Sequence, residues 1–537
     1  MENKKAGNGF LILSFAGILG KLLSAMYVPL LKNILGNTGY GIYTGGYDIF
    51  VFLIAITSLG VQPAVTKVVT ELRITGNNKD ALRAMRLARK YFTIISIIIA
   101  VLFMIIATPL AKAINRESST LTFIFLAPAI IFAAILSAYR GYMQGIEEMQ
   151  SLAISQLIEQ FINVILSLIF AAGLLVVTGS NNWGSAGGTV GTSLGAIGAI
   201  IYILYIYEKK GYEEEENIVS KNKNKKITDK KIVRKLFSYA IPICLVAGVQ
   251  NFAGVIDTIT VGMSLKWAGL GNQVYDLSAT LSYYKTLVYV PLAIVTALGT
   301  SIFPNVIKAF INKDKKDLKK QTTYAFRITY IIVIPATFGL AILSKEIYRF
   351  LLNESKGYEL LAYGSALLIF MSITTIQNVI LQGINKLYLI IASASAGLVA
   401  KIILNLILVP IKSVNIIGAV VATFVSYIIP TVINHRKIEG FFKVKVPIVK
   451  QAIIPTICSI AMTGVIFMSK YPILKAAEFL GGGRIVIAIS TLILIAIGGI
   501  VYLYSMVIFG GIRRKDLDLI SPKLFKLLPR RLRKELI

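Results

Sequence analysis

Five basic side chains lie within stretches that are otherwise apolar enough to cross a bilayer: Lys21, Lys67, Lys285, Arg327 and Lys401. A Lys or Arg at the centre of a membrane helix costs about 2.5–3.5 kcal/mol to insert. Such side chains are therefore expected to face a water-filled cavity or a charged partner, because hydrocarbon does not solvate them. A cavity lined by positive charge predicts an anionic cargo.

Lys21, Lys285 and Lys401 are the predicted substrate-binding residues. Each lies well inside its apolar stretch, and the ammonium group is a compact, hydrated charge that contacts phosphate without rigid geometry. Lys67 and Arg327 lie closer to the ends of their stretches, where a long side chain can extend to the headgroup region. A direct role in binding is therefore not assigned to these two residues.

Three carboxylates, those of Asp48, Glu159 and Asp257, lie in the same apolar surroundings and need solvation or a partner. Two interpretations stay open for them. One is a structural ion pair, with Asp48 or Asp257 beside Lys21 and Glu159 beside Lys401. The other is a site for a coupling cation.

Arg140 and Gln144 lie at the predicted cytoplasmic end of the fourth stretch, where helix capping or gating of a passage is expected. The single histidine, His435, and the two cysteines, Cys244 and Cys458, form no metal-binding or redox pattern. The chain also has no Gly-x-x-x-x-Gly-Lys-Ser/Thr loop and no nucleophile–base arrangement. We therefore predict no metal, no cofactor and no enzymatic activity, and we exclude ATP hydrolysis as a driving force.

Membrane helices are the elements expected to position these residues. The chain has 537 residues, of which 56% are hydrophobic, and its mean hydropathy is +0.73. Ordinary soluble domains are only about 45–50% apolar. Predominantly apolar stretches of 20 or more residues, each long enough to cross a bilayer, occupy residues 8–33, 40–70, 88–111, 119–143, 151–178, 184–207, 236–264, 278–307, 321–344, 359–381, 387–410, 414–434, 447–469 and 484–510. The predicted fold is an all-α polytopic membrane protein with about 14 transmembrane helices.

The formal net charge of +30 is distributed unevenly along the chain. With the N-terminus inside, about 40 of the 56 Lys and Arg residues fall in cytoplasmic segments, as the positive-inside rule requires. This predicts a multi-pass protein of the cell membrane with both termini in the cytoplasm. The basic runs are interpreted as topology signals beside anionic headgroups, and no binding of nucleic acid is predicted.

Two pairs of segments indicate that the chain contains two related halves. Residues Ile56–Lys67 resemble Val295–Lys308, and Met143–Gly145 resemble Leu381–Gly383 at nearly the same spacing. Because an even number of stretches lies in each half, a pseudo-two-fold axis along the membrane normal and a central cleft are expected. The predicted domains are an N-lobe with helices 1–6 (1–207), a cytoplasmic linker (208–235), a C-lobe with helices 7–12 (236–437), helices 13–14 (438–510) and a basic amphipathic cytoplasmic tail (511–537).

The segment Phe125–Glu159 closely resembles the fourth-to-fifth helix region of bacterial lipid II flippases, in particular the branch that includes stage V sporulation protein B. Its most specific parts are Arg140-Gly141-Tyr142-x-Gln144-Gly145 and Ile154-Ser155-Gln156-x-x-Glu159. Similar matches occur at Gly20–Leu23, Ser185–Gly191 and Lys401–Asn405. The resemblance covers about residues 8–510, and it departs from the pattern at Val28, where relatives often carry a basic residue.

The resemblance implies a place in the multidrug/oligosaccharidyl-lipid/polysaccharide exporter superfamily, with two pseudo-symmetric six-helix lobes plus two C-terminal helices. It implies a monomer in the bacterial plasma membrane that moves lipid II, a polyprenyl-diphosphate-linked glycan, from the inner to the outer leaflet by alternating access. The cell-wall role would be in growth or in sporulation, with Na⁺ or H⁺ as a possible coupling ion.

Three alternatives remain: a flippase for another polyprenyl-diphosphate oligosaccharide, a cation-coupled multidrug exporter and a membrane glycosyltransferase. Basic residues outnumber acidic ones within the spans, which disfavours an exporter of cationic drugs. The predicted external loops are short and carry no Asp-x-Asp at a span end, which disfavours a glycosyltransferase.

Overall fold

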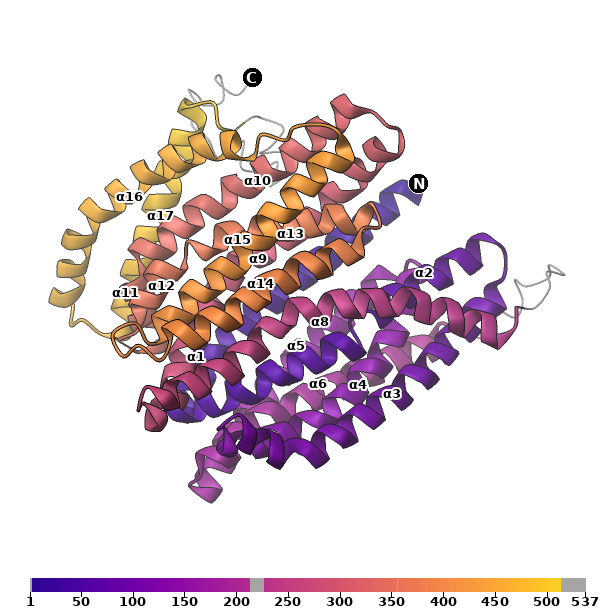
Figure 1. The fold of residues 1–537 in the computed structure, drawn as a ribbon, viewed down its shortest axis with the longest axis horizontal. Helices are drawn as coiled ribbons and strands as arrows, with labels where there is room; N and C mark the ends of the chain where they lie inside the picture. The colour runs from indigo at the N-terminus through magenta and orange to yellow at the C-terminus, as the bar shows by residue number, and fades with distance from the viewer. Residues whose placement is uncertain (1, 213–226, 355, 513–537) are drawn as a thin grey trace. The chain divides into compact units, whose positions relative to one another are not determined.

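The computed structural model describes residues 2–212, 227–354 and 356–512 (Figure 1), with the side chains of all of these except residues 2–15, 18, 21, 25 and 300–305. Every regular element in these ranges is a helix. The prediction of an all-α protein is therefore confirmed. By its contacts the chain divides into two compact units, unit 1 with Met1–Ser282 and Leu387–Ser426, and unit 2 with Tyr283–Lys386 and Tyr427–Ile537.

Unit 1 contains the N-terminal helices together with two helices from later in the chain. These elements are α1 (Glu2–Thr57), α2 (Val61–Ile74), α3 (Asn78–Ala113), η1 (Glu117–Ser119), α4 (Thr120–Gly145), α5 (Met149–Thr178), α6 (Asn181–Lys209), α8 (Asp229–Trp267), η2 (Gly271–Gln273), the start of α9 (Val274–Ile311), α14 (Leu387–Leu408) and the start of α15 (Ile416–Phe442).

Unit 2 contains the remainder of α9 and α15. Its other elements are α10 (Lys315–Ile342), α11 (Ser344–Ile347), the π-helical turn η3 (Tyr348–Leu352), α12 (Tyr358–Gly364), α13 (Leu367–Gly383), α16 (Ile448–Phe479) and α17 (Arg484–Ile508).

Among the described residues, 12 helices are long and apolar enough to cross a membrane, or up to 13 if the bent pair α12 and α13 is one span. One of the 12 is the stretch Leu22–Ile74, whose 53 residues are far too many for one crossing, because a helix rises about 1.5 Å per residue and the hydrocarbon core is about 30 Å thick. Gly36 interrupts α1 with φ 69°, a conformation that glycine adopts without a Cβ penalty. Gly36 lies between the first two predicted stretches. The sequence therefore predicts two spans where the structure has one long helical stretch, and this explains why its number of spans is higher.

Small residues bring α5 and α6 into close contact. A Cβ atom added at Gly187, Gly191 or Gly195 of α6 would lie 2.4, 2.3 or 2.5 Å from a backbone oxygen of α5. Only glycine allows two helix backbones to approach so closely, as in other membrane helix pairs. This packing fixes the position of α5, which carries Glu159.

In unit 2 the two C-terminal helices are joined to α10 by polar contacts. Lys470 of α16 forms an ion pair with the buried Glu346 at 2.9 Å and donates a hydrogen bond to the carbonyl of Ile342. The Tyr502 hydroxyl of α17 donates to the carbonyl of Ile331 on α10 at 2.8 Å. These contacts fasten α16 and α17, which lie outside the sequence repeat, to α10, which lies inside it.

The two units do not coincide with the predicted lobes. The seventh and eleventh predicted stretches become α8 and α14, and both group with the N-terminal helices in unit 1. Contacts describe one conformation, whereas the repeat describes a relation between sequences, so the pseudo-symmetric lobes stay a prediction. Residues 213–226 of the predicted linker and 513–537 of the predicted tail lie outside the described residues.

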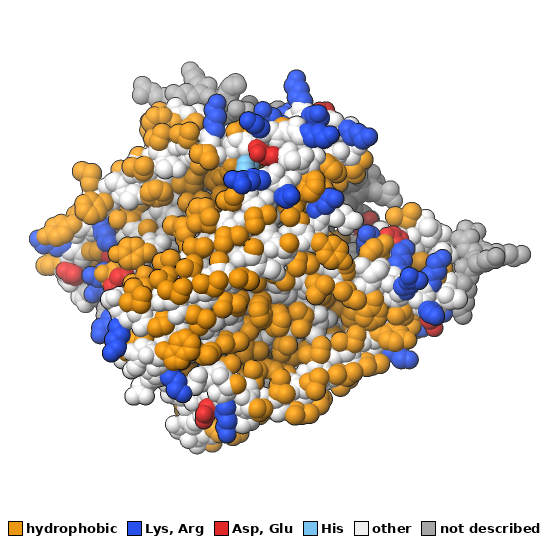
Figure 2. Space-filling view, in the orientation of Figure 1, with side chains coloured by type: hydrophobic (Ala, Val, Ile, Leu, Met, Phe, Trp, Pro, Cys, Tyr) orange, Lys and Arg blue, Asp and Glu red, His pale blue; other side chains and the backbone are white. Residues whose placement is uncertain are grey.

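The distribution of side chains on the surface fits a membrane protein. Hydrophobic side chains cover the long helices, and Lys and Arg gather toward helix ends (Figure 2). In unit 1 one such cluster lies where α2 ends and where α3 and α8 begin, as Figures 1 and 2 show together. With its many apolar helices, the chain is a multi-pass membrane protein.

Candidate functional site

A buried ion pair joins α8 to α14 within unit 1. The Lys401 ammonium lies 2.8 Å from Oδ2 of Asp257, and the two side chains are only 1% and 3% exposed. The ammonium also donates to the Thr423 hydroxyl at 3.0 Å. The sequence pattern predicts Lys401 as an intramembrane charge. Its partner on α8 is 144 residues away in the chain and could be found only in the structure.

Asn405 completes this polar cluster. It lies one helical turn after Lys401 on the same face of α14, and its amide nitrogen donates to Oδ1 of Asp257 at 3.0 Å and to the Thr260 hydroxyl at 2.8 Å. Within the described part of the chain, its amide oxygen is buried without a hydrogen-bond partner. The Lys401 ammonium therefore contacts one oxygen of the Asp257 carboxylate and the Thr423 hydroxyl, while Asn405 donates to the other oxygen of that carboxylate.

The cluster bears on two predictions. The structural interpretation placed Glu159 beside Lys401. That partner is wrong, because the carboxylate beside Lys401 is that of Asp257, and Glu159 contacts Arg140. A coupling cation at Asp257 would have to displace an ammonium group from the carboxylate. Contact between Lys401 and cargo stays a prediction, and it requires this pair to open.

A second intramembrane pair joins α4 to α5. Nη1 of Arg140 lies 2.7 Å from Oε2 of Glu159, and Nε of Arg140 donates to the Ser155 hydroxyl at 3.0 Å. One helical turn after Arg140, the Gln144 side-chain oxygen accepts hydrogen bonds from Gln62 at 2.9 Å and, more weakly, from Thr66 of α2. Arg140 and Gln144 thus fasten α4 to two neighbours, and their predicted gating role stays a prediction.

The other candidate residues lie on α1 and α9. The side chain of Lys21, on α1, lies outside the described part of the structure. Lys285 is half-buried on α9 in unit 2, whereas Lys401 belongs to unit 1. Asp48 of α1 accepts a hydrogen bond from the Thr258 hydroxyl of α8 at 3.3 Å, next to Asp257 in the chain. The structure therefore brings Asp48 and Asp257 to the same segment of α8.

The two basic residues set aside in the sequence, Lys67 on α2 and Arg327 on α10, each have a defined contact. The Lys67 ammonium is 3.9 Å from the centre of the Tyr239 ring, a cation–π contact. Arg327 donates to the carbonyl of Gly511 at 2.9 Å within unit 2. Both contacts are consistent with side chains that extend toward the headgroup region.

Sequence reasoning missed Arg116, between α3 and η1. Its side chain is 2% exposed, and it donates to the Thr258 carbonyl of α8 at 3.2 Å and to the Ser278 hydroxyl of α9 at 2.7 Å. A second contact to the start of α9 comes from α1, whose Thr38 hydroxyl donates to Asp276 at 2.7 Å. A signal existed, because a basic residue in a predicted external loop runs against the positive-inside rule.

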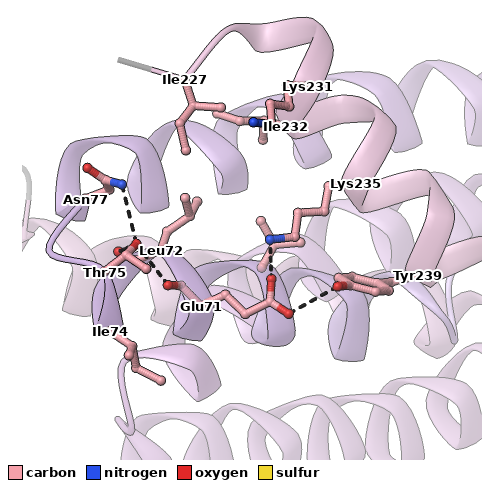
Figure 3. A pocket seen from close by; sticks show the side chains of 11 residues that line it. Glu71, Leu72, Ile74, Thr75, Asn77, Ile227, Lys231, Ile232, Lys235 and Tyr239 are labelled. Atoms are coloured by element: carbon pink, nitrogen blue, oxygen red, sulfur yellow. Dashed lines mark hydrogen bonds and ion pairs between the residues drawn. The ribbon is translucent and has the colours of Figure 1, made fainter. Parts of the chain in front are cut away.

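At the opposite end of α8, a pocket of about 590 Å³ lies between its first turns and α2 (Figure 3). Lys235 forms an ion pair with Glu71 of α2, and the Tyr239 hydroxyl donates to the same carboxylate at 3.1 Å. Leu72, Ile74 and Ile232 are among the apolar residues of its wall. Polar side chains thus hold α8 to the N-terminal helices near its start and at Thr258, and the adjacent Asp257 holds it to α14.

Comparison with known proteins places the chain in a family. A family model described as polysaccharide biosynthesis protein matches residues 6–310. The chain is similar to the lipid II flippase MurJ of Bacillus subtilis, with 26% identity over 532 residues that cover 94% of this chain and 95% of the relative. It is also similar to stage V sporulation protein B of Bacillus subtilis, with 21% identity over 453 residues that cover 83% and 86% of the two chains.

A solved structure shares the fold. The lipid II flippase MurJ in an inward closed conformation superposes with a TM-score of 0.68 at 16% identity, over 93% of this chain and 98% of that chain. The resemblance to lipid II flippases and stage V sporulation protein B, predicted from Phe125–Glu159, is confirmed. Since the family match covers more than half of its length, the chain belongs to the polysaccharide biosynthesis protein family.

Proposed function

We propose that the chain is a flippase that carries a lipid-linked glycan across the bilayer. The observation that carries this proposal is the family match over residues 6–310 in a chain whose membrane helices hold buried charges. Charged residues inside membrane helices are costly, and they characteristically mark substrate or ion pathways. A glycan on a polyprenyl diphosphate requires such a pathway, because its tail can stay in lipid while its phosphates and sugars cannot cross hydrocarbon.

The proposed cargo is lipid II, moved from the inner to the outer leaflet. The similarity to a lipid II flippase over nearly the full length of both chains supports this choice. A second cargo, another polyprenyl-diphosphate oligosaccharide, is supported by the broader description of the family, which names polysaccharide biosynthesis. Both cargoes present a diphosphate, so the same cationic side chains would serve for either.

The proposed mechanism is alternating access in which α8 exchanges its contacts near its start and at Thr258. Arg116 and Glu71 would release α8 in turn, so that one of these two contact regions opens while the other stays closed. In the open passage the cargo diphosphate would compete with Asp257 for the Lys401 ammonium, and Lys21 and Lys285 would add positive charge. A lysine suits such an exchange because its point charge accepts more than one geometry of partner.

The proposed driving force is the membrane potential or consumption of the product, with no ion required at Asp257. Lys401 already neutralises that carboxylate, and moving one charge through 100 mV supplies about 2.3 kcal/mol. We further propose a monomer in the bacterial plasma membrane with both termini cytoplasmic, which follows from the distribution of Lys and Arg.

Cells depleted of their own flippases provide the test. Expression of the chain should restore lipid II that is accessible to a probe added outside the cells, as measured by labelling and chromatography. Failure to restore it, with the protein shown to be inserted in the membrane, would exclude lipid II as cargo. Purified protein in liposomes with a fluorescent undecaprenyl-diphosphate glycan then tests the broader proposal, and chemical conversion of that lipid without translocation would identify an enzyme instead.

A further inference from the structure

A second cavity in unit 1 takes half of its eight lining residues from the basic side chains of one helix. Its volume is about 540 Å³, within the range of small-ligand sites. Arg83, Arg86, Arg89 and Lys90 of α3 line it, together with Asp229 at the start of α8. The transport mechanism proposed above uses none of these residues.

The cavity lies at the end of a lipid-facing apolar stripe on the same helix. The stripe consists of Ile94, Ile98, Val101, Leu102 and Ile105, each 45–68% exposed. α3 has 36 residues, which at about 1.5 Å per residue makes it longer than the hydrocarbon core of about 30 Å. With the stripe in the hydrocarbon, the basic residues of the first turns therefore lie at the level of the lipid headgroups.

We propose that this cavity binds the phosphate group of a membrane lipid whose hydrocarbon chains lie along the apolar stripe of α3. Arg86, Arg89 and Lys90 are exposed and line the opening, and Arg presents its N–H groups in the fork that matches phosphate oxygens. Two lipids carry this chemistry, an acidic phospholipid and a polyprenyl diphosphate. The site takes the group that the two share.

Asp229 acts as a built-in competitor for the lipid phosphate. Its carboxylate forms an ion pair with Arg83, which also donates to Asp80 at 3.2 Å and to the Ile227 carbonyl at 2.9 Å. A phosphate in the cavity would share Arg83 with Asp229, which belongs to the first turn of α8. Occupancy of the cavity would therefore weaken one contact that holds the start of α8 to α3.

Binding is measured on the purified full-length protein in phosphatidylcholine nanodiscs, by native mass spectrometry during titration with phosphatidylglycerol or with undecaprenyl diphosphate. The test variant is Arg86→Gln/Arg89→Gln/Lys90→Gln, which leaves the contacts of Arg83 in place. We expect a loss of affinity of about 100-fold, because each basic side chain near the surface contributes about fivefold. Asp229→Asn should act in the opposite direction and tighten binding by about fivefold.

The matched control is Lys315→Gln/Lys316→Gln/Lys319→Gln, which removes three exposed charges from the first turns of α10. A loss for both lipids in the test variant and not in the control supports a general lipid-phosphate site. A loss for phosphatidylglycerol alone identifies a phospholipid site, and a loss for undecaprenyl diphosphate alone identifies a loading site for the cargo. Unchanged binding in the test variant, or an equal loss in the control, overturns the proposal. Because transport is not measured, failure here leaves the proposed flippase function untouched.

Discussion

The two intramembrane ion pairs of unit 1 differ in burial and in partners. Lys401 and Asp257 are 1% and 3% exposed, whereas Arg140 and Glu159 are 10% and 26% exposed. The first pair joins helices from distant parts of the chain, and the second joins the consecutive helices α4 and α5. A fully buried charge depends on its partner far more strongly than one that water reaches. The difference indicates that Lys401–Asp257 holds a long-range arrangement and that Arg140–Glu159 stabilises a local one.

The largest expected effect follows from removal of Lys401. In Lys401→Met the Asp257 carboxylate stays buried without its ammonium, and the loss of stability should be about 3–5 kcal/mol. Thermal unfolding of the purified protein in detergent measures this loss. A variant as stable as the parent would show that Asp257 finds another partner or takes up a proton without cost.

A double variant separates structure from transport at the same pair. Lys401→Met/Asp257→Leu should recover most of the lost stability, since replacing a buried pair by apolar groups is often neutral. If Lys401 serves the cargo, the double variant folds but does not move lipid II in the depletion assay. Normal transport by a stable double variant would mean that the pair is structural only.

A smaller effect is expected from sodium in the variant Lys401→Ala. Removal of the ammonium leaves the oxygens of Asp257 and Thr423 beside a vacant position, and hard cations prefer oxygen ligands. At 100 times its dissociation constant, Na⁺ would stabilise the variant by about 2.7 kcal/mol. The unfolding temperature is compared in NaCl and in choline chloride. An equal shift in the parent would contradict the view that Lys401 already fills this position.

The Arg140–Glu159 pair should be less sensitive to substitution. Glu159→Gln keeps a hydrogen-bond acceptor for Arg140 and leaves the contact with Ser155 in place, so we expect a loss of about 1–2 kcal/mol. The same unfolding measurement checks it. A loss as large as that of Lys401→Met would remove the distinction between the two pairs.

The smallest effect is expected at a third pair, outside the membrane spans, where Lys210 lies 2.7 Å from Glu148. Desolvation raises the pKa of Glu148, but hydrogen bonds from Lys210 and Ser151 outweigh it, so the pKa lies below its ordinary value of 4.5. A carboxylate with a lowered pKa contributes stability above its ordinary pKa and loses it as the pH falls through the folded value. Lys210→Gln should therefore reduce the loss of stability below about pH 4.5, by less than about 1 kcal/mol because water screens the pair. An unchanged acid profile would show that this pair contributes nothing.

Much of the fold could be predicted because its signals are local. Apolar stretches of span length predicted the membrane helices, and the break at Gly36 coincides with the gap between the first two stretches. Lys401, Asp257 and Glu159 were recognised as intramembrane charges, whereas Arg140 was predicted at the cytoplasmic end of its helix. The resemblance of Phe125–Glu159 to lipid II flippases predicted the family.

Which charged side chains form ion pairs with one another was less predictable, because this depends on which helix faces meet. Lys401 was paired with Glu159 in one sequence interpretation, yet Glu159 contacts Arg140 and Lys401 contacts Asp257. Arg116 escaped notice because a single Arg in a short loop resembles a solvated surface residue until its burial is known. The grouping of α8 and α14 with the N-terminal helices likewise has no counterpart in the sequence repeat.

By itself, the sequence determined that this chain is a polytopic helical membrane protein with charges inside its spans, because hydropathy and charge are properties of each segment alone. Only the tertiary structure decided which of those charges neutralise one another, and that α8 is held near its start and at the adjacent residues Asp257 and Thr258. The physical reason is that a charge in a low-dielectric interior is stabilised by the few atoms within hydrogen-bond distance, and the packing of helices far apart in the chain selects those atoms.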